Sequence, residues 1–317
     1  MDKHSQIAVC SRSFSRNEAL RSVLDSRYEH IRYNDEGLSL SGQELVSFLQ
    51  GCNKVIVGLE VVDADILSGL PELKVVSKYG VGLDMLDLAA MRDHGVRLGW
   101  TPGVNKRSVT ELVIAFAISM LRRVPECQQK VRAGEFRQIP GGLLTGRTVG
   151  IIGCGNIGQD LVPILNAFGC DVQAYDIRDY SAFYEAHGVR AVDLETLLRT
   201  SDIVTLHVPL DSSTRQMLDK KALESLRSTA ILINLARGDL VDETCLKEML
   251  QDGRLAAAAF DVFAPEPPTD MELLALPNFL ATPHIGGSAV EAIHAMGMAA
   301  IEGLEENTIP ELQASTS

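Results

Sequence analysis

Four predicted strands in the second half of the chain end in side chains that could do chemistry. In chain order, these residues are His207, Arg237, Asp261 with Glu266, and His284. Ligands bind outside the carboxyl ends of the strands in an open parallel sheet, so the four strand ends should meet at one edge. A histidine there can exchange a proton near neutral pH, and an arginine can hold a carboxylate with two hydrogen bonds. One polar residue after a strand is ordinary, but four in succession predict an active site.

Each of these residues also has a structural alternative. A histidine after a strand is more often a loop residue whose ring hydrogen bonds are satisfied locally. Arg237–Gly238 could be a surface turn, and Glu266, which lies between Pro265 and Pro267, could be a solvated acid. The functional interpretation depends on these residues acting together.

The segment from Thr148 to Asp176 predicts which ligand this edge binds. An apolar run leads directly into the turn GCGNIG, which is followed by a helical pattern and a second strand. That strand ends in Asp176, 18 residues after Gly158. Strand, glycine turn, helix and acid in this order are typical of a dinucleotide-binding βαβ unit. The alternative is a glycine-rich turn that only packs a helix on a sheet.

The residues of this unit have distinct expected roles. Gly153 permits the tight turn, Gly155 lets the backbone approach a pyrophosphate, and Gly158 lets the helix pack closely on the sheet. The amino end of the helix then faces the phosphates. Asp176 can bond both ribose hydroxyls and repels a 2′-phosphate, so NAD is the expected cofactor. Arg178 is the one argument for NADP.

Composition limits the class of protein. A chain of 317 residues suggests two domains, and a net charge of −13 argues against general binding to nucleic acid or anionic membranes. There is no apolar signal region at the amino terminus and no apolar run of the ~18 residues that a membrane span needs. The six cysteines form no CxxC pair and show no zinc spacing. We therefore expect a cytoplasmic protein without a bound metal.

The first hundred residues alternate between strand and helix patterns. The expected strands are 7–10, 31–33, 55–57, 73–77 and 96–98, and the expected helices are 17–24, 42–49, 64–70 and 86–93. Such repetition implies a parallel sheet with helices on both faces, and therefore a small α/β domain.

A second α/β domain is expected after the break at Thr101–Pro102. The helical run 108–123 is apolar on more than one face, which places it between layers or at a subunit interface. After 148–152 and 172–175, the expected strands are 203–208, 230–235, 256–260 and 279–281, and the intervening helices are 181–187, 194–199, 220–226 and 243–250. The last helix, 288–305, is placed to return to the first domain.

The sequence thus predicts an α/β fold of two doubly wound parallel-sheet domains, Rossmann-like and flavodoxin-like. Residues 1–101 with 288–317 would form the substrate-binding domain, and residues 102–287 the NAD-binding domain. The active site is expected in the cleft between the two domains.

The motifs of the chain resemble those of the D-isomer-specific 2-hydroxyacid dehydrogenase family. The matching stretches are KYGVGLDMLDL, GCGNIG, TLHVPL, INLARGDLVDE, FDVFAPEPP and TPHIGG, and they cover nearly the whole chain. The stretch TPGVNKRSVTELV is most similar to the phosphoglycerate dehydrogenase branch. Because the chain stops near residue 317, we expect a short form without the regulatory domain that many of those enzymes carry.

The resemblance implies an NAD-dependent hydride transfer between a 2-hydroxy acid and a 2-oxo acid. His284 would be the acid–base group, and Glu266 would hydrogen-bond its other ring nitrogen. Arg237 would hold the substrate carboxylate and polarise the carbonyl in the reverse direction.

Further contacts are implied by the resemblance. The implied cofactor contacts are the backbone of Asn156 and Ile157, the adenosine-side residues His207, Pro209 and Thr214, and Ala236, Asp261 and Gly287. In the first domain, the main chain around Gly80 and Val81 would bind the substrate carboxylate. Lys78 could meet the far end of the substrate. The alternatives are a plain strand-to-helix turn and a solvated lysine.

The chain departs from the phosphoglycerate branch after the third strand. An arginine is common there near the substrate phosphate, whereas this chain has Val57-Gly58-Leu59-Glu60. A phosphorylated substrate is therefore in doubt, although Lys78 or Arg107 could compensate.

Two alternatives to a 2-hydroxyacid dehydrogenase are an NAD(H)-responsive corepressor of the same fold and a formate- or phosphite-oxidising relative. A homodimer is the family expectation, and the apolar run 108–123 supports it.

Overall fold

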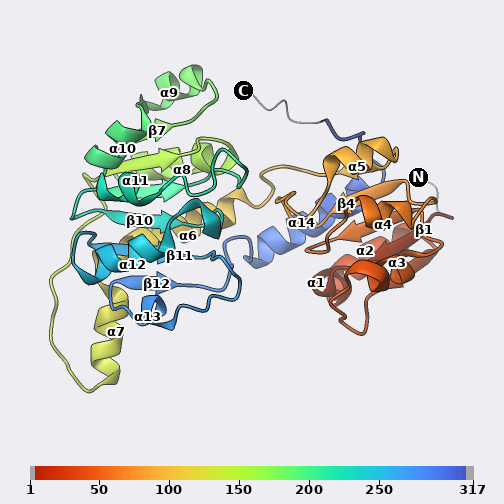
Figure 1. The fold of residues 1–317 in the computed structure, drawn as a ribbon, viewed down its shortest axis with the longest axis horizontal. Helices are drawn as coiled ribbons and strands as arrows, with labels where there is room; N and C mark the ends of the chain where they lie inside the picture. The colour runs from red at the N-terminus through yellow and green to blue at the C-terminus, as the bar shows by residue number, and fades with distance from the viewer. Residues whose placement is uncertain (1–3, 312–317) are drawn as a thin grey trace. The chain divides into compact units, whose positions relative to one another are not determined.

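The computed structural model describes residues 4–311 and consists of two compact units (Figure 1). Unit 1 comprises Met1–Asn105 and Val290–Ser317, and unit 2 comprises Lys106–Ala289. The boundaries expected from the sequence, at 101–102 and 287–288, lie close to these. In the described residues, no helix is long and apolar enough to cross a membrane.

Unit 1 contains a five-stranded parallel sheet. Its strands are β1 (Gln6–Val9), β2 (His30–Tyr33), β3 (Lys54–Val57), β4 (Val75–Lys78) and β5 (Arg97–Gly99). Their order in the sheet is β2-β1-β3-β4-β5, and every pairing is parallel. This is the flavodoxin-like order, in which the switch point lies between β1 and β3.

Helices cover both faces of this sheet. The helices are α1 (Arg12–Ser15), α2 (Glu18–Arg27), α3 (Gly42–Leu49), α4 (Ala64–Ser68), α5 (Leu88–Asp93) and α14 (Val290–Gly303). Side chains of α3, α4 and α5 form one apolar core with the sheet. Side chains of α1, α2 and α14 form the other core. The last helix of the chain therefore completes the fold of the first segment.

Small residues allow α14 to pack closely on the sheet. A Cβ on Gly99 would lie 2.2 Å from the carbonyl oxygen of Gly303, and a Cβ on Gly297 would lie 2.3 Å from Leu20. The Ser77 hydroxyl donates a hydrogen bond of 2.6 Å to the Ala300 carbonyl. These contacts fix the helix on β4, β5 and α2.

Unit 2 contains a seven-stranded parallel sheet. Its strands are β6 (Thr148–Ile152), β7 (Asp171–Tyr175), β8 (Arg190–Ala191), β9 (Ile203–Leu206), β10 (Ile231–Asn234), β11 (Ala257–Phe260) and β12 (Phe279–Ala281). The order is β12-β11-β10-β9-β6-β7-β8, with parallel pairing throughout. The strand order reverses between β6 and β9, which is where open α/β sheets bind ligands.

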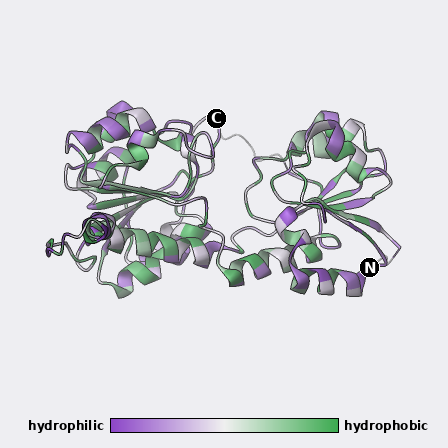
Figure 2. Ribbon diagram, turned by 90° about the horizontal axis from the view of Figure 1, so that it is seen from below, coloured by the Kyte–Doolittle hydropathy of each residue, from purple (hydrophilic) through white to green (hydrophobic). Residues whose placement is uncertain are grey.

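Two layers of helices enclose this second sheet. The helices are α6 (Lys106–Leu121), α7 (Val124–Arg132), α8 (Asn156–Ala167), α9 (Ser181–His187), α10 (Leu194–Thr200), α11 (Lys220–Glu224), α12 (Glu243–Gln251) and α13 (Met271–Leu274). Residues of α6, α8 and α9 form one core, and residues of α10 to α13 form the other. In Figure 2 the helices carry both hydrophobic and hydrophilic stretches, as expected for helices that cover a sheet.

Helix α6 is not buried on all sides within unit 2, although its sequence allowed that. The face with Val109, Val113 and Phe116 is buried in the core of the unit. Ala115 and Ile118 are exposed, so no second layer covers this face within unit 2. The subunit interface, which was the other expected placement, stays a prediction for this face.

Candidate active site

The glycine turn after β6 has the geometry that a dinucleotide site needs. Gly153 has φ +92°, and a Cβ on it would lie 2.7 Å from the carbonyl oxygen of His207. A Cβ on Gly158 would lie 2.7 Å from the carbonyl oxygen of Gly153, so the first turn of α8 packs directly on the loop. A Cβ on Gly155 would meet nothing within 4 Å. The first and third glycines are thus required by packing, while Gly155 faces space that a pyrophosphate can occupy.

The amino end of α8 and Asp176 complete this half of the site. No side chain caps the helix at Gly155, so its first N–H groups are suited to an anion. The Asp176 carboxylate accepts the N–H of Cys154 at 2.6 Å and the N–H of Arg178 at 2.8 Å. These bonds fix the acid beside the glycine turn, where it can meet a ribose.

His207 follows β9 at the switch point. Its Nε2 lies 3.0 Å from the Thr205 hydroxyl, and its Nδ1 is buried without a hydrogen-bond partner among the described residues. Burial lowers the pKa of His207 to about 3, so the ring is neutral near neutral pH. Nearby, the Thr214 hydroxyl donates to the Pro209 carbonyl at 2.7 Å. The expected adenosine contacts of His207, Pro209 and Thr214 stay predictions.

Asn234 organises the turn that carries Arg237. This residue is fully buried at the end of β10. Its amide donates to the Arg237 carbonyl at 2.7 Å and accepts the Ala236 N–H at 3.0 Å. Asn234 is not among the site residues expected from the sequence. Because both ends of its amide are bonded to the turn, it holds the backbone of Ala236 and Arg237 in place.

Glu266 and His284 form the expected pair. Glu266 Oε2 lies 2.9 Å from His284 Nδ1, and the two side chains are 40% and 49% exposed. Glu266 Oε1 accepts the N–H of Phe263 at 3.1 Å. The pair leaves Nε2 as the ring nitrogen available to a substrate. Such a carboxylate fixes the orientation and tautomer of an acid–base histidine.

Asp261 is buried beneath the loop that carries His284. It is 1% exposed, and its carboxylate accepts the N–H of Ile285 at 2.8 Å, the N–H of Gly286 at 2.6 Å and the hydroxyl of Thr282. His284 itself has φ +54°, a left-handed conformation that is uncommon for a non-glycine residue. Asp261 therefore stabilises an unusual backbone at the candidate acid–base residue. Sequence reasoning missed this role, and the expected contacts of Asp261 and Gly287 with the cofactor stay predictions.

The candidate substrate residues of the first domain lie in unit 1. Lys78 is only 5% exposed and donates to the Gly58 carbonyl, so it is not a solvated lysine. Gly80 has φ +127°, and the Val81 carbonyl accepts the indole N–H of Trp100 at 3.0 Å. The expected roles of Lys78, Gly80 and Val81 in substrate binding stay predictions.

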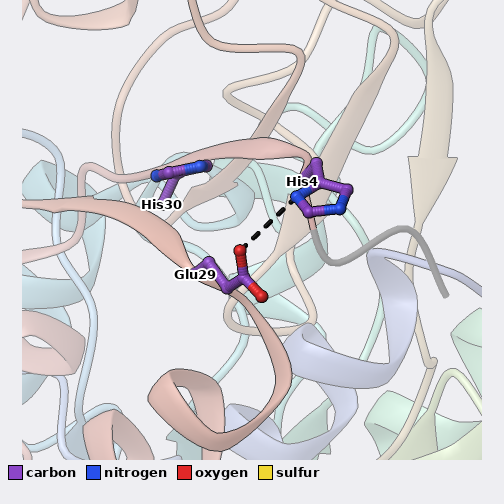
Figure 3. A group of neighbouring side chains, drawn as sticks. All are labelled: His4, Glu29 and His30. Atoms are coloured by element: carbon purple, nitrogen blue, oxygen red, sulfur yellow. Dashed lines mark ion pairs between the residues drawn. The ribbon is translucent and has the colours of Figure 1, made fainter.

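One group of possible metal ligands occurs among the described residues, and it was not expected from the sequence. His4, Glu29 and His30 bring one ligand atom each to within 4.8 Å of one another (Figure 3). All three are exposed, and His4 lies 3.4 Å from Glu29 in an ion pair. They lie at the amino ends of β1 and β2, whereas ligands of such sheets bind at the carboxyl ends. We therefore assign this group no part in the chemistry of the candidate active site.

Comparisons with known proteins agree with the architecture of both units. The family model "D-isomer specific 2-hydroxyacid dehydrogenase, NAD binding domain" matches residues 114–286. A hydroxypyruvate reductase of Thermotoga maritima is 34% identical over 290 residues, which cover 88% of this chain and 94% of that protein. A D-3-phosphoglycerate dehydrogenase of Methanocaldococcus jannaschii is 35% identical over 283 residues, and the match covers 88% of this chain but only 54% of that protein.

A similar solved structure comes from Polaromonas sp. JS6 66, and its name assigns it to the NAD-binding D-isomer specific 2-hydroxyacid dehydrogenases. The TM-score is 0.87 at 31% identity, with 95% of this chain and 96% of that chain covered. These named relatives are dehydrogenases or reductases, which favours an enzyme over a corepressor of the same fold.

Proposed function

The chain belongs to the D-isomer specific 2-hydroxyacid dehydrogenase family, and from this premise we propose that Arg237, Glu266 and His284 carry out its reaction. The reaction is the NAD-dependent interconversion of a D-2-hydroxy acid and its 2-oxo acid. The observation that carries the assignment is the 2.9 Å contact between Glu266 and His284 Nδ1. It lies beside β10 and β11, neighbouring strands whose ends also supply Arg237 and Asp261.

We infer the following roles for the protein groups. His284 Nε2 takes the hydroxyl proton of the 2-hydroxy acid, and in the reverse direction it returns that proton to the carbonyl oxygen. Glu266 stabilises the imidazolium that forms when the proton is held. Arg237 binds the substrate carboxylate through its planar guanidinium. The nicotinamide supplies the hydride acceptor.

A panel of 2-hydroxy and 2-oxo acids tests this function. NADH absorbance would be followed with phosphorylated, sulfonated and unsubstituted acids. We expect turnover of a small D-acid with a second polar end, and no turnover of its L-isomer. Tight NADH binding with no oxidation or reduction of any acid in the panel would contradict the proposal. The panel also decides whether the substrate carries a phosphate.

Asp176 is proposed to select NAD over NADP. Replacing it by alanine removes the negative charge and both ribose hydrogen bonds, so the preference for NAD in kcat/KM should fall by roughly 10- to 100-fold. Kinetics with both cofactors measure this change. Asp179→Ala is a matched control, since Asp179 lies in the same loop and bonds only to Ser181 among the contacts described. An unaltered preference in Asp176→Ala would mean that Asp176 does not bind the ribose.

We propose that the protein forms a homodimer, because unit 2 exposes apolar side chains on helix α7 and in the segment after it. Helix α7 has no buried residue and projects away from the sheet, and the segment after it returns to β6 (Figure 1). Phe136 is 96% exposed, Leu143 68% and Val131 56%. We expect a second copy of the chain to cover these side chains and the exposed face of α6.

The oligomeric state of a charged variant tests the dimer. Phe136→Asp with Leu143→Asp should convert a dimer into a monomer at micromolar concentration, because two carboxylates cannot be buried in an apolar interface without a large cost. Light scattering after gel filtration measures the mass. Met271→Asp, at a residue that is 69% exposed in the same unit, should remain dimeric. A monomeric parent protein would contradict the proposal.

All six cysteines are free, which supports the proposed cytoplasmic location.

A further inference from the structure

The loop that carries Glu266 has few backbone N–H groups that could form hydrogen bonds to fix its position. Residues 264–268 read Ala-Pro-Glu-Pro-Pro, so only Ala264 and Glu266 have a backbone N–H. Residues 264–267 are exposed. The position of the Glu266 carboxylate therefore depends on a small number of anchors.

Glu243 provides one of these anchors from another element. It is the first residue of α12, directly after the cap residue Asp242. Its Oε1 accepts the N–H of Ala264 at 3.3 Å. The adjacent N–H, that of Phe263, is bonded to Glu266 itself. Two consecutive N–H groups of the loop are thus held by two glutamates, one of which contacts His284.

The same loop also packs on the turn that carries Arg237. A Cβ on Gly238 would lie 2.1 Å from the carbonyl carbon of Phe263 and 2.5 Å from the nitrogen of Ala264. The backbone of this turn therefore touches the loop at the two residues whose N–H groups are held. A shift at Ala264 would reach both Glu266 and the segment beside Arg237.

We propose that Glu243 is a positioning residue that holds Glu266 against His284 by accepting the Ala264 N–H. This inference rests on the proposed roles of Glu266 and His284. Glu243 belongs to the motif INLARGDLVDE, but none of the roles assigned above uses it. It acts through the loop and is not required to touch the substrate.

The surroundings of Glu243 are unfavourable for a carboxylate, which argues against a merely solvated acid. The pKa of Glu243 is raised to about 7, mainly by burial; the Ala264 N–H lowers it, and the charges of Asp239 and Asp270 contribute to raising it. Asp239 is paired with Arg215, and Asp270 is paired with Lys247 at 2.7 Å. These two cations are thus already engaged by other acids, and the Ala264 N–H is the hydrogen-bond donor that the described residues offer to the Glu243 carboxylate.

The raised pKa has a measurable consequence for stability. The folded protein holds the Glu243 proton more tightly than a free glutamate of pKa 4.5 does. The free energy of unfolding should therefore fall as the pH rises from 4.5, the pKa of a free glutamate, through about 7, the pKa in the folded protein. Glu243→Gln removes this decline, so its Tm should exceed that of the parent more at pH ~8.5 than at pH ~5.

Steady-state kinetics of three variants test the positioning role. Glu243→Ala should lower kcat by roughly 10- to 100-fold, because a displacement of the catalytic pair of about 1 Å has effects of this size. The Kd for NADH should change by less than about twofold. Glu243→Gln keeps an acceptor oxygen and should retain most of the activity. Glu248→Ala, an exposed glutamate on the same helix, is the control. If the alanine variant does not fold, Glu243→Met removes the acceptor with less loss of volume.

A double-mutant cycle with Glu266→Gln separates this inference from the function on which it depends. In the Glu266→Gln background, Glu243→Ala should lower kcat by less than about twofold more. If Glu266→Gln alone leaves kcat unchanged, the proposed function fails. If Glu266→Gln lowers kcat but Glu243→Ala does not, or if the two losses multiply, the positioning role is overturned. Equal losses in Glu243→Ala and Glu243→Gln also overturn it.

Discussion

Replacing His284 by glutamine is expected to lower kcat by about 10²- to 10⁴-fold, while the Kd for NADH changes by less than about twofold. Glutamine can still donate a hydrogen bond to Glu266, but it cannot take up or release a proton near neutral pH. The loss should therefore fall on the proton-transfer step. Stopped-flow or steady-state assays measure kcat, and NADH fluorescence titration measures cofactor binding.

The same substitution at His187 is the control for His284. His187 ends α9, next to β8 at the far end of the sheet from β12, and its ring packs on Phe183 at 4.2 Å. His187→Gln should retain the parent kcat. Glu266→Gln should lower kcat less than His284→Gln, because the histidine can still exchange a proton when its partner is neutral. Unchanged kcat in His284→Gln would show that His284 is not the acid–base group.

Much of the fold could be predicted because the sheets are buried on both faces. Continuous apolar runs mark such strands, and Thr148–Ile152 has the bounds expected from the sequence. The short strand Arg190–Ala191 is exposed and has no apolar run, so nothing in the sequence marked it. Helix α7 was missed for a related reason, since it buries no residue and its polar sequence shows no apolar stripe.

The site divides in the same way between local and distant contacts. The spacing of Gly153, Gly155 and Gly158 predicts a turn. The structure fits that turn, because an added Cβ would clash at Gly153 and Gly158 and would meet open space at Gly155. The bonds from Asp261 to the His284 loop and from Glu243 to Ala264 join residues more than 20 positions apart. No local pattern predicts such contacts, because they depend on which strand ends lie next to each other in the sheet.

Replacing Arg237 by leucine should be nearly as damaging as the loss of His284, but it should act on the substrate. A hydrogen bond to a charged group contributes about 1.5–3 kcal/mol, so the loss of a two-bond contact should lower kcat/KM by roughly 10²- to 10⁴-fold. Much of this loss should appear as a higher KM for the acid, since the guanidinium binds the carboxylate in the ground state as well. The Kd for NADH should be nearly unchanged.

Arg237→Lys distinguishes the charge of Arg237 from its shape. Lysine keeps the positive charge but lacks the planar pair of N–H donors, so its kcat/KM should lie between those of the parent and of Arg237→Leu. Arg254→Leu is the control, because Arg254 is an exposed arginine of the same unit that pairs with Asp252 at 2.9 Å. If Arg237→Leu and the parent have the same KM for every acid that is turned over, another cation binds the substrate carboxylate. Lys78, buried at the end of β4, would then be the next residue to replace.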